Sequence, residues 1–100
     1  MDQEVVWTNQ AWLDLENIAD YISRDSEYYA SQIVSEIREA TSLLPDFPKR
    51  GRTVPEVDDS FIRELLVGNH RLIYRVEGER IYILTIVHTA RDLDQLWEDE

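Results

Sequence analysis

The stretch FIRELLVGNHRLIYRV, residues 61–76, gathers side chains that are or can become cationic: Arg63, His70, Arg71 and Arg75. A guanidinium binds phosphate or carboxylate through paired hydrogen bonds, so a cluster of arginines predicts an anion site. Glu64 lies in the same stretch and would neutralise part of that charge. The alternative is a structural ion-pair cluster, in which each exposed pair contributes about 0.2–1 kcal/mol.

His88 is a candidate general base, because an unperturbed histidine titrates near neutral pH. The alternative is a structural histidine at the end of a strand. His70 and His88 fall on different predicted strands without a third ligand, and the chain has no cysteine. We therefore expect no metal site, and no cofactor is expected either.

The chain has a net charge of −11 that is unevenly distributed. Residues 1–48 carry −8, residues 49–91 carry +2, and residues 92–100 carry −5. A domain that relies on phosphate neutralisation is usually basic over a broad face. Direct binding of free nucleic acid is therefore not expected, although a small positive island remains possible.

The length of 100 residues predicts one domain over residues 1–100, and 43% hydrophobic residues are typical of a globular protein. The opening MDQEVVW has no apolar signal run, and no later segment is long enough to span a bilayer. We expect a cytoplasmic protein without membrane contact.

Two amphipathic helices follow a short predicted strand, EVVW at residues 4–7. Thr8 is the expected N-cap of the first helix, and Trp7 and Trp12 are spaced to form a hydrophobic staple across it. The spacing of the apolar residues predicts that this helix ends at about Ser23.

Asp25 or Ser26 is expected to cap the second helix, and Pro45 ends it, because the residue before proline avoids the α region. A short turn joins the two helices, so they should lie antiparallel. Residues 45–60 contain all three prolines and no periodicity, which predicts a long surface loop, either functional or a simple crossover.

The chain alternates from Phe61 onward and predicts a three-stranded antiparallel meander. Its turns are expected at Gly68–Asn69 and Gly78–Glu79. With the first strand added at one edge, the order β-α-α-β-β-β predicts an α+β fold of two layers, a helical hairpin packed on an antiparallel sheet.

The period of two divides the meander into two faces. The face toward the helices should hold Arg63 near its edge and a group of apolar residues: Leu65, Val67, Leu72, Tyr74, Val76, Ile81, Ile83 and Val87. The other face should hold Ile62, Glu64, Leu66, Arg71, Ile73, Arg75, Tyr82, Leu84, Ile86 and His88.

The second face is apolar at its centre, and such a sheet surface is usually covered. One candidate cover is a terminal helix at residues 92–97 (DLDQLW), and the other is a partner protein. The acidic tail, residues 92–100, is expected to end in solvated residues without a function of their own.

Several segments, in this order, resemble the ParE branch of the RelE/ParE superfamily, the toxins of bacterial toxin–antitoxin (plasmid stabilisation) modules. They are WTNQAWLDLENIADYI, FPKRGRTVPE, IRELLVGNHRLIYRV and IVHTARDL. The resemblance covers roughly residues 4–94. It implies the helical hairpin on an antiparallel sheet and two activities: RelE-type members cleave mRNA in the ribosomal A site, whereas ParE-type members inhibit DNA gyrase without recognised catalytic residues.

The nuclease residues of the family carry over in part. The resemblance matches the two catalytic arginines to Arg71 and Arg91, with His88 as a possible base. The paired lysines of the family fall at Ile62 and Glu64, which cannot stabilise a phosphorane, and the tyrosine that some members use aligns near Trp97. This pattern favours the ParE-like interpretation over the nuclease.

We therefore expect a ParE-like toxin that binds and inhibits DNA gyrase and is neutralised by a cognate antitoxin. The expected partner-binding residues are Arg63, Leu66, Arg71, Ile73, Arg75, Leu84 and Arg91. One alternative is a RelE-like ribosome-dependent mRNA endoribonuclease using Arg71, Arg91 and His88, with the ribosome and mRNA as its target. A second alternative is a detoxified homologue that acts as a binding or regulatory subunit.

Overall fold

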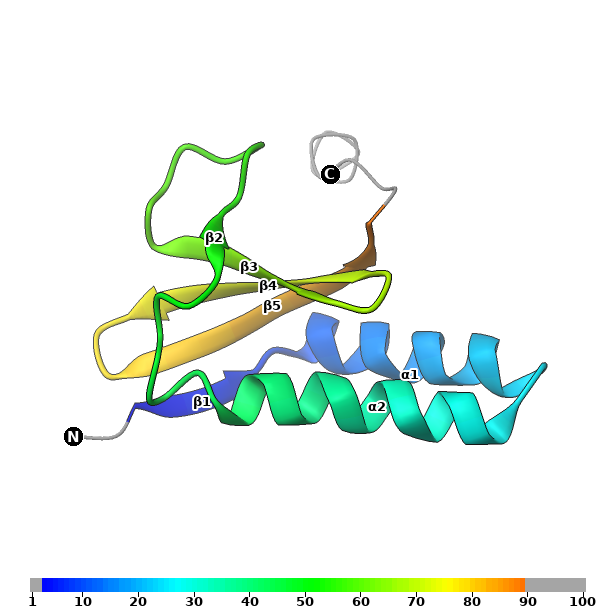
Figure 1. The fold of residues 1–100 in the computed structure, drawn as a ribbon. Helices are drawn as coiled ribbons and strands as arrows, with labels where there is room; N and C mark the ends of the chain where they lie inside the picture. Colours follow the sequence, from blue (N-terminus) through cyan, green and yellow to red (C-terminus); the bar gives the residue numbers. More distant parts are fainter. Residues whose placement is uncertain (1–2, 90–100) are drawn as a thin grey trace.

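The computed structural model describes residues 3–89, which form two helices packed on one face of a five-stranded sheet (Figure 1). The elements in chain order are β1 (Glu4–Trp7), α1 (Asn9–Ser23), α2 (Glu27–Ser42), β2 (Arg52–Thr53), β3 (Ile62–Val67), β4 (His70–Glu77) and β5 (Arg80–His88). The strand order is β1-β5-β4-β3-β2. Among the strands of residues 3–89, only β1 pairs in parallel, at the edge beside β5. The predicted two-layer α+β fold is confirmed, and no helix in residues 3–89 is long and apolar enough to cross a membrane.

The start of α1 is fixed by two contacts that the sequence predicted. The hydroxyl oxygen of Thr8 accepts a hydrogen bond from the Ala11 amide (3.2 Å) and donates to the Ile83 carbonyl (2.7 Å). The rings of Trp7 and Trp12 stack with centroids 4.8 Å apart. The cap and the staple therefore tie the helix to β5 as well as starting it.

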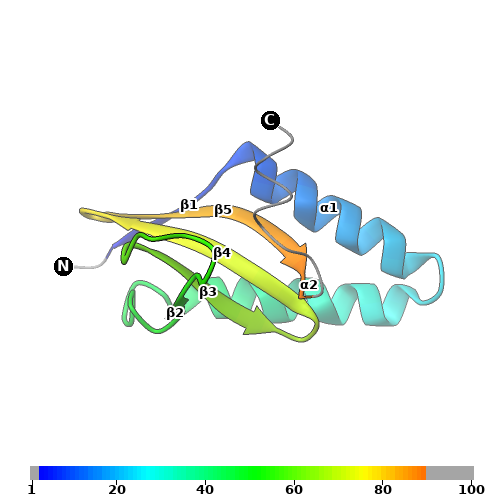
Figure 2. The same ribbon diagram turned by 90° about the horizontal axis from the view of Figure 1, so that it is seen from above.

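Ser26, one of the two expected residues, caps α2 by accepting from the Tyr29 amide at 3.2 Å. The helix ends at Ser42, three residues before Pro45. The two helices lie antiparallel across the sheet (Figures 1 and 2). Their inward stripe packs on the sheet to form the main core, whose buried members are Ala11, Leu15, Ile37, Leu44, Val67, Leu72, Tyr74, Ile81, Ile83 and Ile86.

Both hairpins turn where the sequence predicted, over two residues. Val67 pairs with His70 and Glu77 pairs with Arg80. Gly68 and Gly78, each first in its turn, have φ of 57° and 59°, and no other residue in the described chain has positive φ. A glycine with positive φ in the first position is the pattern of a type II′ turn, which matches the twist of the strands it joins.

A β-bulge in β5 changes the predicted face of every residue after it. Ile73 pairs with Thr85, but Tyr74 pairs with Ile83, so Leu84 is an extra residue. The bulge reverses the alternation. As a result Ile86 lies in the main core and Val87 on the opposite face, and both predictions for these residues were wrong.

The loop of residues 45–60 folds back over the face of the sheet that lies away from the helices (Figure 1). Its only strand, β2, pairs with β3. Val54 and Val57 pack against Ile73 and Val87 in a second apolar cluster. The chain's own loop thus covers the apolar centre of this face, an arrangement that neither expected cover anticipated. The expected terminal helix at residues 92–97 lies outside the described residues.

Candidate functional site

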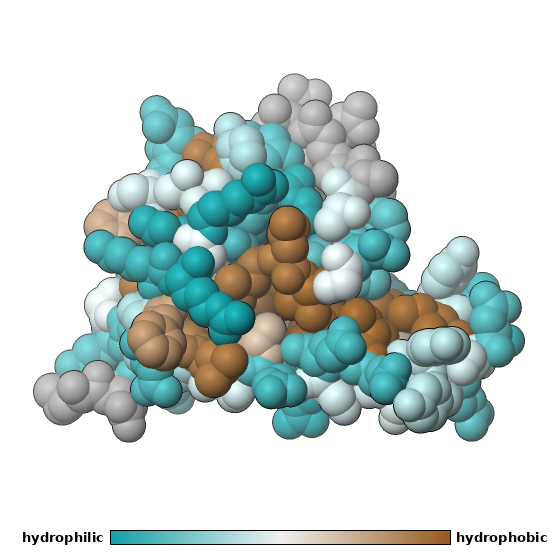
Figure 3. All heavy atoms as spheres, viewed as in Figure 1, coloured by the Kyte–Doolittle hydropathy of each residue, from teal (hydrophilic) through white to brown (hydrophobic). Residues whose placement is uncertain are grey.

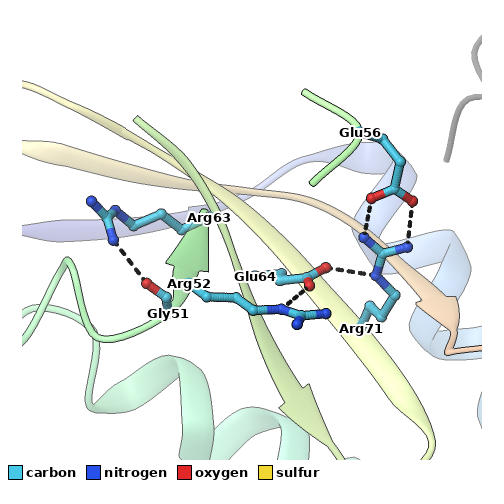
Figure 4. Close-up of polar contacts among 6 residues, drawn as sticks. All are labelled: Gly51, Arg52, Glu56, Arg63, Glu64 and Arg71. Carbon is cyan, nitrogen blue, oxygen red and sulfur yellow. Dashed lines mark hydrogen bonds and ion pairs between the residues drawn. The ribbon is translucent and has the colours of Figure 1, made fainter. Parts of the chain in front are cut away.

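Arg71 lies at the centre of an ion-pair cluster that joins β2, β3, β4 and the 45–60 loop (Figure 4). Its Nε donates to Glu64 Oε2 at 2.6 Å, and its Nη1 and Nη2 donate to the two carboxylate oxygens of Glu56, each at 2.8 Å. Arg52 donates from Nε to the other oxygen of Glu64. The Glu64 side chain is fully buried and that of Arg71 is 7% exposed, whereas 61% of the Arg52 side chain is exposed.

The charges of this cluster balance, with two guanidinium groups facing two carboxylates. The hydrogen bonds that Arg71 donates to Glu56, and then the one to Glu64, raise the pKa of Arg71 further above its usual value against the opposing effect of burial. Moving charges out of water is unfavourable, so a buried pair of this kind contributes more to defining one arrangement of the chain than to net stability. The cluster holds the 45–60 loop against the sheet.

Arg63, which the sequence placed near the edge of the helix-side face, donates hydrogen bonds to backbone carbonyls of the loop. It pairs with Tyr74 at the edge of the helix-side face, and its Nη1 donates to the Gly51 carbonyl at 2.9 Å. The hydroxyl of Tyr74 accepts from the Gly51 amide at 2.8 Å, and burial raises the pKa of this tyrosine. Arg63 and Tyr74 together anchor the start of the loop.

The remaining expected partner-binding residues are spread over different environments. Leu66 is 58% exposed and Arg75 is also exposed on the surface of β4. Leu84 is partly buried, and Ile73 is fully buried beneath Val54, so Ile73 is not accessible to a partner in this structure. Arg91 lies outside the described residues.

His88 does not share a face with Arg71, contrary to the prediction, because the β5 bulge moves it to the helix side. It lies directly opposite His70, with ring centroids 5.8 Å apart and the rings edge to face. The Thr89 amide donates to the Asn69 carbonyl at 2.9 Å, which makes His70 and His88 a non-hydrogen-bonded pair, the closer kind of cross-strand neighbours. Burial, and then the nearby His88, lower the pKa of His70.

Two contributors to the Arg71 cluster, Glu56 and Arg52, were not recognised as site residues. Glu56 is 15 positions from Arg71, so no periodicity connects the two. Both lie in FPKRGRTVPE, one of the segments that carry the family resemblance, which was the only signal for them in the sequence.

The family model described as "ParE toxin of type II toxin-antitoxin system, parDE" matches residues 5–93. The chain belongs to the ParE toxin family. It is therefore a toxin of the type II class within the ParE/RelE superfamily, as the sequence resemblance predicted.

Two curated relatives of this ParE-family chain are also toxins. Toxin RelE2 of Caulobacter vibrioides is 35% identical over 89 residues, covering 88% of this chain and 97% of the relative. Toxin ParE1 of Mycobacterium tuberculosis is 33% identical over 67 residues, covering 66% of this chain and 67% of the relative. The curated proteins similar to this chain thus include toxins named RelE and toxins named ParE.

Solved structures of similar toxins have the same fold. The chromosomal ParDE system from P. aeruginosa contains a chain with a TM-score of 0.71 and 27% identity, covering 86% of this chain and 95% of that one. A mutant of the E. coli toxin RelE in the free state gives a TM-score of 0.67 at 10% identity, covering 98% of this chain and 93% of that one. The second likeness concerns the fold alone.

Proposed function

We propose that this ParE-family chain acts by binding and inhibiting DNA gyrase, without catalysis of its own, in a plasmid-stabilisation type of module. The observation that carries the proposal is the enclosure of the Arg71 guanidinium between the carboxylates of Glu56 and Glu64. Because bacterial gyrase works on DNA in the cytoplasm, we place the activity there.

RNA cleavage of the RelE type requires positive charge concentrated where negative charge develops on the phosphate. A phosphate approaching Arg71 would have to displace Glu56 and would then lie close to Glu64, whose carboxylate is 2.6 Å from Arg71 Nε. His88, the candidate base, lies on the opposite face of the sheet. These positions favour an inhibitor that binds its target over a ribosome-dependent endoribonuclease.

We further propose that a cognate antitoxin protein neutralises the toxin. Two similar structures are described as toxin–antitoxin complexes, RelBE2 from Mycobacterium tuberculosis and YoeB–YefM from Staphylococcus aureus, with 21% and 15% identity. Leu66 and Arg75 are exposed and stay candidates for contacts with a partner, and Arg91 remains a prediction.

A supercoiling assay with purified DNA gyrase and the purified chain tests the proposed target. We expect inhibition of supercoiling at micromolar toxin and its reversal when the cognate antitoxin is added. The heat-unfolded chain is the matched control and should not inhibit. Unchanged supercoiling with a chain shown to be folded by circular dichroism would remove gyrase as the target.

Growth on expression of the chain without an antitoxin distinguishes an active toxin from a detoxified binding subunit. We expect growth arrest that co-expression of the antitoxin relieves. Normal growth with the folded chain accumulating in the cells would instead favour the detoxified homologue.

A further inference from the structure

A groove follows the boundary between the helical hairpin and the β3–β4 turn. One part is a cavity of about 490 Å³ on the α1 side, and the other is a cavity of about 230 Å³ on the α2 side. Ile22, Asn69 and His70 line both cavities, so the two adjoin at the turn, and together we call them the turn groove. Figure 3 shows apolar surface between the helices and the sheet on the α2 side.

The turn groove has the composition of a surface that binds a protein segment. Tyr21 and Tyr29 line it and are 71% and 64% exposed, and Ile18 and Ile33 supply further apolar surface. Exposed tyrosines beside apolar hollows are typical of interface anchors, because they offer a large contact area with little loss of conformational freedom.

The charge of the turn groove has one sign. Asp14 and Glu36 line it, and no lysine or arginine is among the described residues that do. The burial of His70 lowers its pKa and so favours its neutral form. Residues 9–44, which include both helices, carry seven carboxylates and two arginines. A positively charged segment would therefore be attracted to the groove and a negatively charged one repelled.

We propose that the turn groove binds a basic amphipathic segment of a partner protein, with apolar side chains in the hollow and lysine or arginine side chains toward Glu36 and the tyrosine rings. A cation over a tyrosine face adds to the attraction. The chain's own residues 92–100 contain five carboxylates and no basic residue, and a second copy of the chain carries −11, so both have the wrong charge.

This inference rests on the proposed function in one respect, because it takes the partner that brings the segment to be the antitoxin. Two arginines of the sheet, Arg63 at the edge of the helix-side face and Arg71 on the opposite face, already donate to groups within the chain. Their guanidinium groups are therefore less available to bind the carboxylates of an acidic partner segment. The acidic helical side, by contrast, is open.

Fluorescence anisotropy with two labelled model peptides tests the proposal on the full chain. Both peptides are amphipathic helices with the same apolar face, and they differ in having lysine or glutamate on the polar face. We expect the lysine peptide to bind and its affinity to fall when NaCl rises from about 50 to about 300 mM, since screening weakens surface attraction. Equal or tighter binding of the glutamate peptide, or binding of neither, would overturn the proposal.

Two pairs of variants locate the binding site. Glu36→Lys should weaken the lysine peptide about tenfold, as expected for reversing one exposed charge at an interface. Asp46→Lys makes the same change in net charge at an exposed position that does not line the groove, and should have less than a twofold effect. Equal weakening by both would show attraction to the whole acidic chain instead of a site.

The second pair tests the apolar contact. Tyr29→Ala should weaken the lysine peptide about tenfold, whereas Phe47→Ala, which removes a ring of nearly the same exposure (63%) away from the groove, should not. Circular dichroism melting checks that all four variants are folded. Peptide binding does not involve gyrase, so failure here leaves the gyrase assignment standing, and failure of the supercoiling assay leaves the groove standing.

Discussion

Glu56 and Arg71 form a bidentate ion pair across 15 residues of sequence, with both hydrogen bonds 2.8 Å long. Glu56 belongs to the loop of residues 45–60, and Arg71 lies on β4 in the middle of the sheet. The pair fixes the loop over the sheet and places Arg71 where an approaching phosphate would meet two carboxylates. The same contact therefore supports both the position of the loop and the proposed function.

Arg71→Ala should lower the free energy of unfolding by about 3–5 kcal/mol, because it leaves the buried Glu64 carboxylate without its buried partner. Urea denaturation followed by circular dichroism measures the change. Arg75→Ala is the matched control on the same strand, and its exposed side chain predicts a change within about 0.5 kcal/mol. A loss below about 1 kcal/mol for Arg71→Ala would contradict a structural role for the ion-pair cluster.

Gly51→Ala should destabilise the chain by about 1–3 kcal/mol, because overpacking forces the backbone to shift. A Cβ at this position would lie 2.5 Å from the Glu64 carbonyl oxygen and 2.7 Å from the Tyr74 hydroxyl. The thermal midpoint measured by differential scanning fluorimetry reports the change. Arg50→Ala, at the exposed neighbouring residue, is the control and should melt close to the parent chain. Identical melting of Gly51→Ala would show that the loop does not approach β3 this closely.

His70 should make the chain less stable as the pH falls below about 6.5, the pKa of an unperturbed histidine. Burial and His88 lower the pKa of His70 in the folded state, so the unfolded state binds the proton more readily. The stabilisation that comes from neutral His70 is fully present above that pH and is lost as the pH falls through the lower pKa of the folded state. Other titratable side chains that line the groove with His70 are His88 from β5, Asp14 from α1 and Glu36 from α2.

Urea denaturation of the parent chain and of His70→Gln at several pH values between about 7.5 and 5.5 measures this effect. The parent should lose more stability over this range than the variant. The two proteins differ only at position 70, so the difference between their curves reports His70. Parallel curves for the two proteins would mean that His70 takes up its proton equally well in the folded and unfolded states.

The elements that depend on local signals were predicted from the sequence. The Thr8 cap, the tryptophan staple and the glycines of both hairpin turns each act within a few residues, so their types and spacing were sufficient. The helix-side face of β3 and β4 followed from alternation alone.

The features that the sequence did not reveal depend on contacts between distant segments. The bulge at Leu84 has no local signature, and it moved His88 away from Arg71. The position of the 45–60 loop depends on Glu56 meeting Arg71 and on Val54 packing over Ile73. These residues lie far apart in the sequence and come together only when the sheet folds. Alternation therefore assigned Arg71 to the correct face but could not identify Glu56 as its partner.

The central claim, that this toxin inhibits by binding while its Arg71 cluster is structural, is tested most directly by primer extension on translating ribosomes. The same preparation of the chain that inhibits gyrase supercoiling is added to the ribosomes. The account predicts full-length messenger RNA, with no cleavage in the codon of the A site. Cleavage at that codon by the folded chain would contradict it and would establish the ribosome-dependent endoribonuclease.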